Sequence, residues 1–232
     1  MIFNSNSKIL IILAHPDDEV LGAGGLLLKA KSSGAKIIIV WLGEGVSARF
    51  RGNELNSKNY NDALLIRENG ARNAMKILGV DDFSFGDLYC LRFDQTPILE
   101  ITKKIEKEIK NFKPDILITH NPIEVNADHV ITFKAVEAAT RPSFLTKKLI
   151  ILGCEIPCSG RWVFEKKFKP NIYIDIKEFF DKKLLAWSQY KGEEKDFPFP
   201  RSERGLKTLA RFRGMECGLE MAEAFKLWRM VL

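Results

Sequence analysis

The sequence lacks the long apolar segments and paired cysteines that would point to a membrane or an oxidising compartment. Its 232 residues hold no apolar run near the roughly 18 residues that suggest a membrane span. The N-terminus lacks the charged, apolar and small-residue order of a signal peptide. None of the four cysteines forms a CxxC pair, and the C-x3-C at 154–158 is a poor zinc spacing. We expect a cytoplasmic protein with no membrane span and with reduced, structural thiols.

The chain also lacks internal repeats, low-complexity segments and any linker that would divide it. Hydrophobic residues make up 46% and charged residues 28% of the sequence, which is ordinary for a globular domain. The length suffices for one sizeable core. We therefore expect a single domain over residues 1–232, with a core at about 7–155 and a C-terminal appendage at about 156–232.

The net charge of +6 is scattered along the chain. The densest lysine groups, at 103–110 and 166–169, alternate with Glu and apolar residues, which is typical of solvated helix faces and loops. The aromatic and basic interleaving of base-stacking folds is missing. We expect no nucleic-acid partner. A basic nucleic-acid-binding module remains an alternative, and salt-sensitive binding that chelators leave unchanged would support it.

Short apolar runs alternate with longer amphipathic stretches, as in parallel strands buried on both faces and joined by crossover helices. We place strands, each bounded by Gly, Pro or Asp, at residues 8–14, 36–42, 82–85, 115–119 and 148–153. Glycines and prolines mark the ends of helices predicted at 22–33, 62–78, 97–112 and 128–140. The predicted fold class is α/β, a Rossmann-like three-layer sandwich with a mostly parallel sheet.

The last third of the sequence changes pattern and predicts a C-terminal α/β appendage on the sheet. It contains a strand-like NIYIDI at 171–176, a helix at about 177–190, a polar loop and a helical stretch at about 205–225. Residues 44–61 are polar and rich in Gly and Asn, which predicts a long loop on the ligand-binding side of the sheet. A lid or substrate-binding loop fits this position.

The sequence has only three histidines, and all map to one rim of the predicted sheet. His15 ends the first strand, His120 ends the strand at 115–119, and His129 begins the next helix. Ligands bind in the crevice beyond the carboxyl ends of such strands. Asp18 lies three residues after His15, so both side chains can converge on one point. A zinc site of two His and one Asp, with a fourth position for water, follows from this clustering.

The carboxylates around this site have their own expected roles. Asp17 is adjacent to the metal but not needed by it, so it is free to act as a general base toward the bound water. Glu19 and the remaining carboxylates, Asp128 among them, would orient the ligand imidazoles.

Simpler interpretations stay open for several of these residues. Asp17 or Asp18 also fits a solvated turn that caps a helix, and Asn126 or Asp128 fits the cap of the helix DHVITFKAVEAAT. His120 fits a hydrogen-bonded structural role as well as a catalytic one. The GAGG at 22–25 does not match GxGxxG and favours close packing of helix against strand.

The strand followed by AHPDDEVLGAGG, with a later DH that opens a helix after THNP, resembles the PIG-L/LmbE family of zinc-dependent deacetylases. The resemblance covers about residues 7–142, and PRSERGLKTLARFRGMECGLEMAEAF is similar to the tail of bacterial sugar deacetylases of this family. It implies removal of the acetyl group from N-acetylglucosamine-type sugars carried on an inositol, a nucleotide, a lipid or another aglycone. Closed oligomers among relatives leave a homo-oligomer open.

By position in the motifs, the resemblance implies zinc ligands at His15, Asp18 and His129 and a general base at Asp17. It also implies a substrate-binding arginine at Arg67, in IRENGARNAMKILGV.

The chain departs from the family pattern at one position, because many relatives read HPDH where this sequence reads Asn126-Ala127-Asp128-His129. The first histidine of that motif polarises or protonates the tetrahedral intermediate. An asparagine amide donates a hydrogen bond to an oxyanion but delivers no proton near neutral pH. Asp17 would then carry out both proton transfers, with Asn126 or His120 steadying the oxyanion.

The expected reaction is zinc-dependent hydrolysis of the N-acetyl group of a small acetamido sugar or sugar conjugate, with release of acetate. Arginines in or near the predicted loops suit a phosphorylated or nucleotide-linked sugar; they are Arg49, Arg51, Arg67, Arg201 and Arg204. A metal-dependent phosphoesterase is the alternative within enzymes, because adjacent carboxylates also hold two metals about 4 Å apart. One zinc per chain favours deacetylation and two favour phosphate chemistry.

Overall fold

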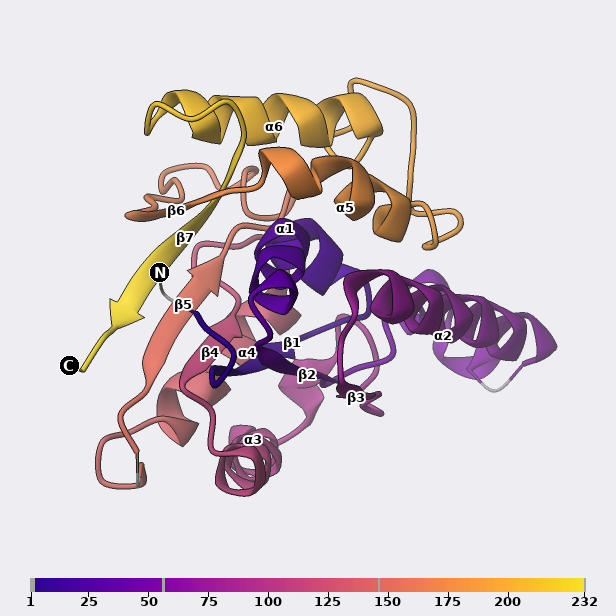
Figure 1. The fold of residues 1–232 in the computed structure, drawn as a ribbon. Coiled ribbons are helices and arrows are strands. Elements are labelled where there is room, and N and C mark those ends of the chain that lie inside the picture. Colours follow the sequence, from indigo (N-terminus) through magenta and orange to yellow (C-terminus); the bar gives the residue numbers. More distant parts are fainter. Residues whose placement is uncertain (1–2, 56, 146, 232) are drawn as a thin grey trace.

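Residues 3–55, 57–145 and 147–231 are described by the computed structural model, and they form a mixed sheet between two layers of helices (Figure 1). The strand order is β3-β2-β1-β4-β5-β7-β6. The strands are β1 (Lys8–Leu13), β2 (Lys36–Trp41), β3 (Asp82–Ser84), β4 (Ile116–Thr119), β5 (Ile150–Cys154), β6 (Ile172–Asp175) and β7 (Ala222–Arg229). β3, β2, β1, β4 and β5 run parallel, whereas β7 is antiparallel to β5 and to β6. The predicted α/β class with a mostly parallel sheet is confirmed.

The helices are α1 (Asp18–Ser32), α2 (Lys58–Leu78), α3 (Ile98–Phe112), α4 (Ala127–Ala139), α5 (Phe180–Trp187) and α6 (Glu203–Met215). α1, α2, α5 and α6 cover one face of the sheet, and α3 and α4 cover the other (Figure 1). Alternate residues of β1 serve the two cores, with Ile9 and Ile11 facing the first group and Leu10 and Ile12 the second. Within the described ranges, no helix is both long and apolar enough to span a membrane.

Helix boundaries follow local signals in the sequence. The hydroxyl of Ser57 accepts a hydrogen bond from the Tyr60 amide at 3.2 Å, so α2 begins inside the segment predicted as a loop. Gly79 ends that helix in the left-handed conformation, as expected. The rest of the predicted loop contains two short 3-10 turns, Ser47–Arg49 and Gly52–Glu54. α1 begins at Asp18 rather than at residue 22, which places Asp18 in its first turn.

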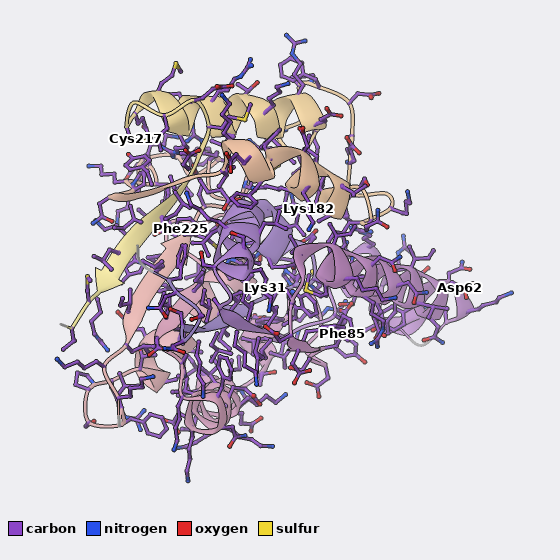
Figure 2. The ribbon with its side chains drawn as sticks, viewed as in Figure 1. Lys31, Asp62, Phe85, Lys182, Cys217 and Phe225 are labelled. Carbon is purple, nitrogen blue, oxygen red and sulfur yellow. The ribbon has the colours of Figure 1, made fainter. Side chains whose placement is uncertain are left out.

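The helical stretch predicted at 205–225 is wrong in its second half. α6 ends at Met215, the chain turns at Gly218 with φ of 76°, and Ala222–Arg229 form β7 between β5 and β6. The Ala, Glu and Met residues there favour a helix in isolation. Pairing with a strand on each side and full burial of Phe225, labelled in Figure 2, override that preference.

The GAGG segment of α1 packs closely on the end of β5, as predicted, and on the residue that follows β6. A Cβ on Gly22 would lie 2.8 Å from Cys154 Sγ, and one on Gly25 would lie 2.5 Å from Ile176 Cγ2. Real side chains do not approach so closely, so larger residues at these positions would push α1 off the sheet. Glycines here hold the beginning of α1, and with it Asp18, against the strands.

An ion pair from the C-terminal third also holds α1. Glu223 of β7 accepts hydrogen bonds from the amides of Gly25 and Leu26 at 2.8 and 2.7 Å. Lys183 of α5 donates to Glu223 at 2.6 Å and to the Leu21 carbonyl at 3.0 Å. Both charged side chains are buried, so their mutual pairing and their bonds to the helix offset the cost of removing them from water.

Candidate active site

His15, Asp18 and His129 place three donor atoms within 4.8 Å of one another, and all three residues are buried. His15 follows β1, Asp18 opens α1 and His129 lies in the first turn of α4. Oδ2 of Asp18 is 3.4 Å from His129 Nε2 and 3.7 Å from His15 Nδ1. Tetrahedral zinc with bonds of about 2.0–2.1 Å holds its ligand atoms about 3.3 Å apart. The donor set and its spacing therefore fit a zinc ion, and these three side chains would hold it.

Asp128 fixes the orientation of His15. Its Oδ2 lies 2.9 Å from His15 Nε2, and its oxygens also accept the amides of Leu91 at 2.5 Å and Phe93 at 3.2 Å. A carboxylate only accepts, so Nε2 carries the proton and Nδ1 is left on the side of Asp18. Burial lowers the pKa of His15, but the bond to Asp128 outweighs it and the pKa is raised well above its usual value. A metal at Nδ1 therefore competes with a proton.

His120 is a buried neighbour of His129 and lies beside the candidate metal-binding group. The two imidazoles stack with centroids 3.9 Å apart and an interplanar angle of 9°. Nε2 of His120 accepts the Ala14 amide at 2.9 Å and lies 3.5 Å from Asp18 Oδ2. Burial lowers the pKa of both rings well below the usual value, and His120 is fully buried. Both rings are thus neutral near pH 7, the state in which imidazole binds metal.

Asp17 adopts a backbone conformation that separates it from Asp18. Its φ of 124° is unusual for a residue with a Cβ and costs on the order of 1–3 kcal/mol. Asp17 Oδ2 lies 2.8 Å from Arg67 Nη1 and 3.4 Å from Arg201 Nη1. Asp18 meanwhile faces the histidines and has its pKa raised to about 7 by burial and by the charge of Asp17. One strained residue thus lets two consecutive carboxylates face different partners.

The Glu19 side chain stabilises the turn that contains Asp17 and Asp18. Its Oε2 accepts the Asp17 amide at 3.0 Å and the Trp41 indole at 2.9 Å, and its Oε1 accepts the Tyr190 hydroxyl at 2.5 Å. Burial raises its pKa to about 7. Expected to orient an imidazole, Glu19 instead contacts the backbone of Asp17 and two aromatic side chains from β2 and the segment after α5.

A buried ion-pair network surrounds Asp17, and the sequence did not predict it. Arg67 donates to the Pro16 carbonyl at 2.6 Å and to Asp17, and its second nitrogen pairs with Glu193. Glu193 also pairs with Arg49 and lies 4.0 Å from Arg201. Burial lowers the pKa of Arg67, but the charges of Asp17 and Glu193 raise it overall. Arg67 and Arg49, both expected to bind substrate, thus meet at Glu193, and the half-exposed Arg49 side chain faces solvent.

Asn126 caps α4, which confirms the capping interpretation. Its side-chain oxygen accepts the Asp128 amide at 3.0 Å, and the residue is partly exposed. The side-chain NH2 is the group left to donate. Of the other arginines predicted in or near loops, Arg204 lies in the first turn of α6 and stacks on the Phe197 ring at 4.2 Å, and the amide of Arg51 donates to Glu54.

The four cysteines are free, as expected. Cys90, His15 and Asp128 form another candidate metal-binding group, whose ligand atoms lie within 4.8 Å of one another. In that group the Asp128 carboxylate already contacts His15 Nε2 and occupies that side of the ring.

Replacing Arg67 by methionine should lower the free energy of unfolding by about 3–5 kcal/mol, because Asp17 and Glu193 would stay buried without their main cation. Urea unfolding measures this change. Arg72→Met on the same helix is the matched control, since Arg72 is half exposed and its pair with Glu68 at 3.4 Å is worth about 1 kcal/mol or less. Equal losses in both variants would contradict a structural role for the buried pair.

The fold and site together define a class: an α/β protein with a candidate metal-binding group of buried His, Asp and His side chains at the carboxyl edge of its sheet. The chain belongs to the PIG-L family, described as GlcNAc-PI de-N-acetylase, whose family model matches residues 10–140. This match confirms the resemblance that the HPDDE and DH motifs indicate.

Relatives resemble the chain in sequence, and solved structures resemble it in fold. Diacetylchitobiose deacetylase of Thermococcus kodakarensis is 28% identical over 238 residues, covering 97% of this chain and 84% of the relative. The structure of N,N'-diacetylchitobiose deacetylase from Pyrococcus horikoshii matches with a TM-score of 0.76 at 22% identity, over 95% of this chain and 83% of that chain. GalB, a 4-carboxy-2-hydroxymuconate hydratase from Pseudomonas putida, matches with a TM-score of 0.79 at 17% identity over 98% of both chains. Because this fold serves more than one reaction, the activity must be argued from the site.

Proposed function

We propose that this protein is a zinc-dependent deacetylase that hydrolyses the N-acetyl group of a small N-acetylated amino sugar or sugar conjugate. The observation that carries the proposal is the meeting of His15, Asp18 and His129 at the sheet edge, with Asp17 beside them on a separate set of contacts. The names of the deacetylase relatives support the sugar substrate class. The products would be acetate and an amino sugar.

Asp17 is the proposed general base and acid. When bound, zinc supplies Lewis acidity toward the acetyl carbonyl oxygen and lowers the pKa of water toward about 7. Asp17 takes a proton from the attacking water and returns it to the nitrogen of the leaving amine. Arg67 and Arg201 both contact Oδ2 of Asp17, so the proton travels on Oδ1. The arginines hold the carboxylate in place while it reacts.

Asn126, rather than His120, is the residue we propose to steady the oxyanion. His120 is fully buried, and its Nε2 already accepts the Ala14 amide. Asn126 is partly exposed at the start of α4, beside the metal-binding His129, and its NH2 is not needed for the helix cap. An amide donor aimed at developing negative charge is the kind of group that stabilises acyl-transfer transition states.

An Asn126→Asp variant separates the two functions of this side chain. Aspartate caps a helix as well as asparagine does, so the free energy of unfolding should be retained. Loss of the NH2 donor should lower kcat by about 100-fold to 1,000-fold. Steady-state acetate release and urea unfolding measure the two effects. An unchanged kcat would assign the oxyanion contact to another group.

Acetate release from a panel of N-acetylated sugars, sugar phosphates and nucleotide sugars tests the proposed reaction. Zinc-loaded protein should release one acetate for each free amine formed, and metal analysis should find one zinc per chain. Inorganic phosphate is measured in the same reactions. Phosphate release without acetate, at two metals per chain, would favour the phosphoesterase alternative.

A further inference from the structure

A buried carboxyl group next to the metal-binding residues makes no hydrogen bond of ordinary geometry with the described residues. The Glu124 side chain is 0% exposed, and neither of its oxygens makes such a bond, although the Ser159 hydroxyl lies close to it. Nδ1 of His129 is buried and lacks a partner as well. The two groups face each other, with Glu124 Oε2 at 3.4 Å from His129 Nδ1. Leaving such groups unpaired costs free energy, so their shared location calls for a function.

We propose that Glu124 is a positioning residue that accepts the Nδ1 proton of His129 and thereby directs Nε2 toward the metal. A carboxyl group keeps an acceptor oxygen whether or not it is ionised. A ring rotation that shortens the contact by about 0.5 Å would bring it to ordinary hydrogen-bond length. The inference rests on the proposed metal site of His15, Asp18 and His129.

The arrangement mirrors the one at His15. There, Asp128 accepts a hydrogen bond from His15 Nε2 at 2.9 Å, and His15 Nδ1 faces Asp18. At His129 the nitrogens exchange roles, because Nε2 lies 3.4 Å from Asp18 Oδ2 and Nδ1 faces Glu124. Histidines that bind metals nearly always donate their other N–H to such an acceptor. Each ligand ring would thus have its own carboxyl group on the far nitrogen.

Neighbouring residues hold Glu124 and the His129 ring in place. The amide of Val125 donates to the Ser159 carbonyl at 3.1 Å, which ties the segment before α4 to the one after β5. A Cβ on Gly160 would lie 3.0 Å from Glu124 Oε1, so that segment packs directly on the carboxyl group. Stacking on His120 fixes the plane of the His129 ring but not which nitrogen faces the metal. Glu124 supplies that second constraint.

Zinc affinity of Glu124 variants tests the proposal. Glu124→Met has similar size and no acceptor oxygen, and it should weaken zinc binding by about 10-fold to 100-fold in competition with a chromophoric chelator. Glu124→Gln keeps one acceptor oxygen and should stay within a few-fold of wild type. Glu137→Met, an exposed glutamate on α4, is the control and should leave the affinity unchanged. An unchanged affinity in a folded Glu124→Met variant would overturn the proposal.

The wild-type protein offers a second readout that needs no variant. In the zinc-loaded protein, ¹⁵N spectra of the histidines should show His129 protonated at Nδ1 and metal-bound at Nε2. Protonation at Nε2, or a second zinc per chain that Glu124→Met removes, would also overturn the proposal. A wild type that binds zinc in this way but releases no acetate would refute the proposed reaction alone. A His129→Ala variant with unchanged zinc affinity would refute both.

Discussion

An Asp17→Asn variant should keep its zinc and its fold while kcat for acetate release falls by about 100-fold to 10,000-fold. The asparagine side chain has nearly the same shape but no basic oxygen, so it neither takes a proton from water nor returns one to the leaving amine. The hydrogen bond from the Asp17 amide to Glu19 Oε2 is a main-chain contact and survives the change. Asp17 is outside the proposed metal-binding group, so zinc content should be unchanged.

Asp62→Asn is the control for this variant. Asp62 is exposed near the start of α2, and Figure 2 shows it at the outer end of that helix. The same chemical change there should leave kcat unaltered. Full activity in Asp17→Asn would remove Asp17 from the proposed proton transfers, and loss of zinc from that variant would make Asp17 a ligand.

An Asp18→Asn variant should lose most of its zinc affinity and, with it, acetate release. Oδ2 of Asp18 lies near the imidazoles of both proposed histidine ligands, at 3.4 Å from His129 Nε2 and 3.7 Å from His15 Nδ1. A neutral amide oxygen in place of the carboxylate is a weaker ligand, so the loss should exceed the roughly 10-fold to 100-fold that removal of an outer hydrogen-bond partner costs. Metal content after dialysis and kcat at saturating zinc measure both effects.

Asp128→Asn provides the comparison, because Asp128 contacts His15 Nε2 rather than the metal position. Its zinc affinity should fall by about 10-fold to 100-fold, less than in Asp18→Asn. The reverse order would place the metal on the Asp128 side of His15, where Cys90 completes another candidate group.

Much of the sheet could be predicted from the sequence because its central strands are continuous apolar runs. Ile9 to Leu13 are fully buried on both faces of β1, so their pattern needs no knowledge of the rest of the fold. β7 differs, because Ala222 and Glu223 favour a helix and only the neighbours β5 and β6 make the segment a strand. Those partners lie far away in sequence. Gly218, with its positive φ, is the one local signal that the helix before it ends.

The candidate site also has a part that the sequence indicates and a part that it does not. His15, Asp17 and Asp18 stand together at the end of a recognisable strand, so the sequence indicates their chemistry directly. The ion pairs around Asp17 are not evident from the sequence. Arg67 contacts Asp17, and Glu193, which pairs with Arg67, lies 126 positions away from it in the chain. The ion pairs of Arg67 were not predicted either, since a buried guanidinium between two carboxylates is recognisable only in three dimensions.

The position of Glu124 in the site was also not predicted from the sequence, although Glu124 stands two residues before the helix cap Asn126. Nothing in IEVNADH marks which acidic side chain turns inward, and the exposed fraction of Glu124 became known only from the fold. The structure adds two carboxyl groups to the motif: Asp128 beside His15 and Glu124 beside His129.

The proposed function requires a zinc ion held by His15, Asp18 and His129. Acetate release from one N-acetylated sugar, measured for chelator-treated protein before and after the return of one equivalent of zinc, tests it most directly. The metal-free protein should release no acetate, reconstitution should restore release fully, and His129→Ala should show no recovery. Equal acetate release with and without metal would contradict that requirement.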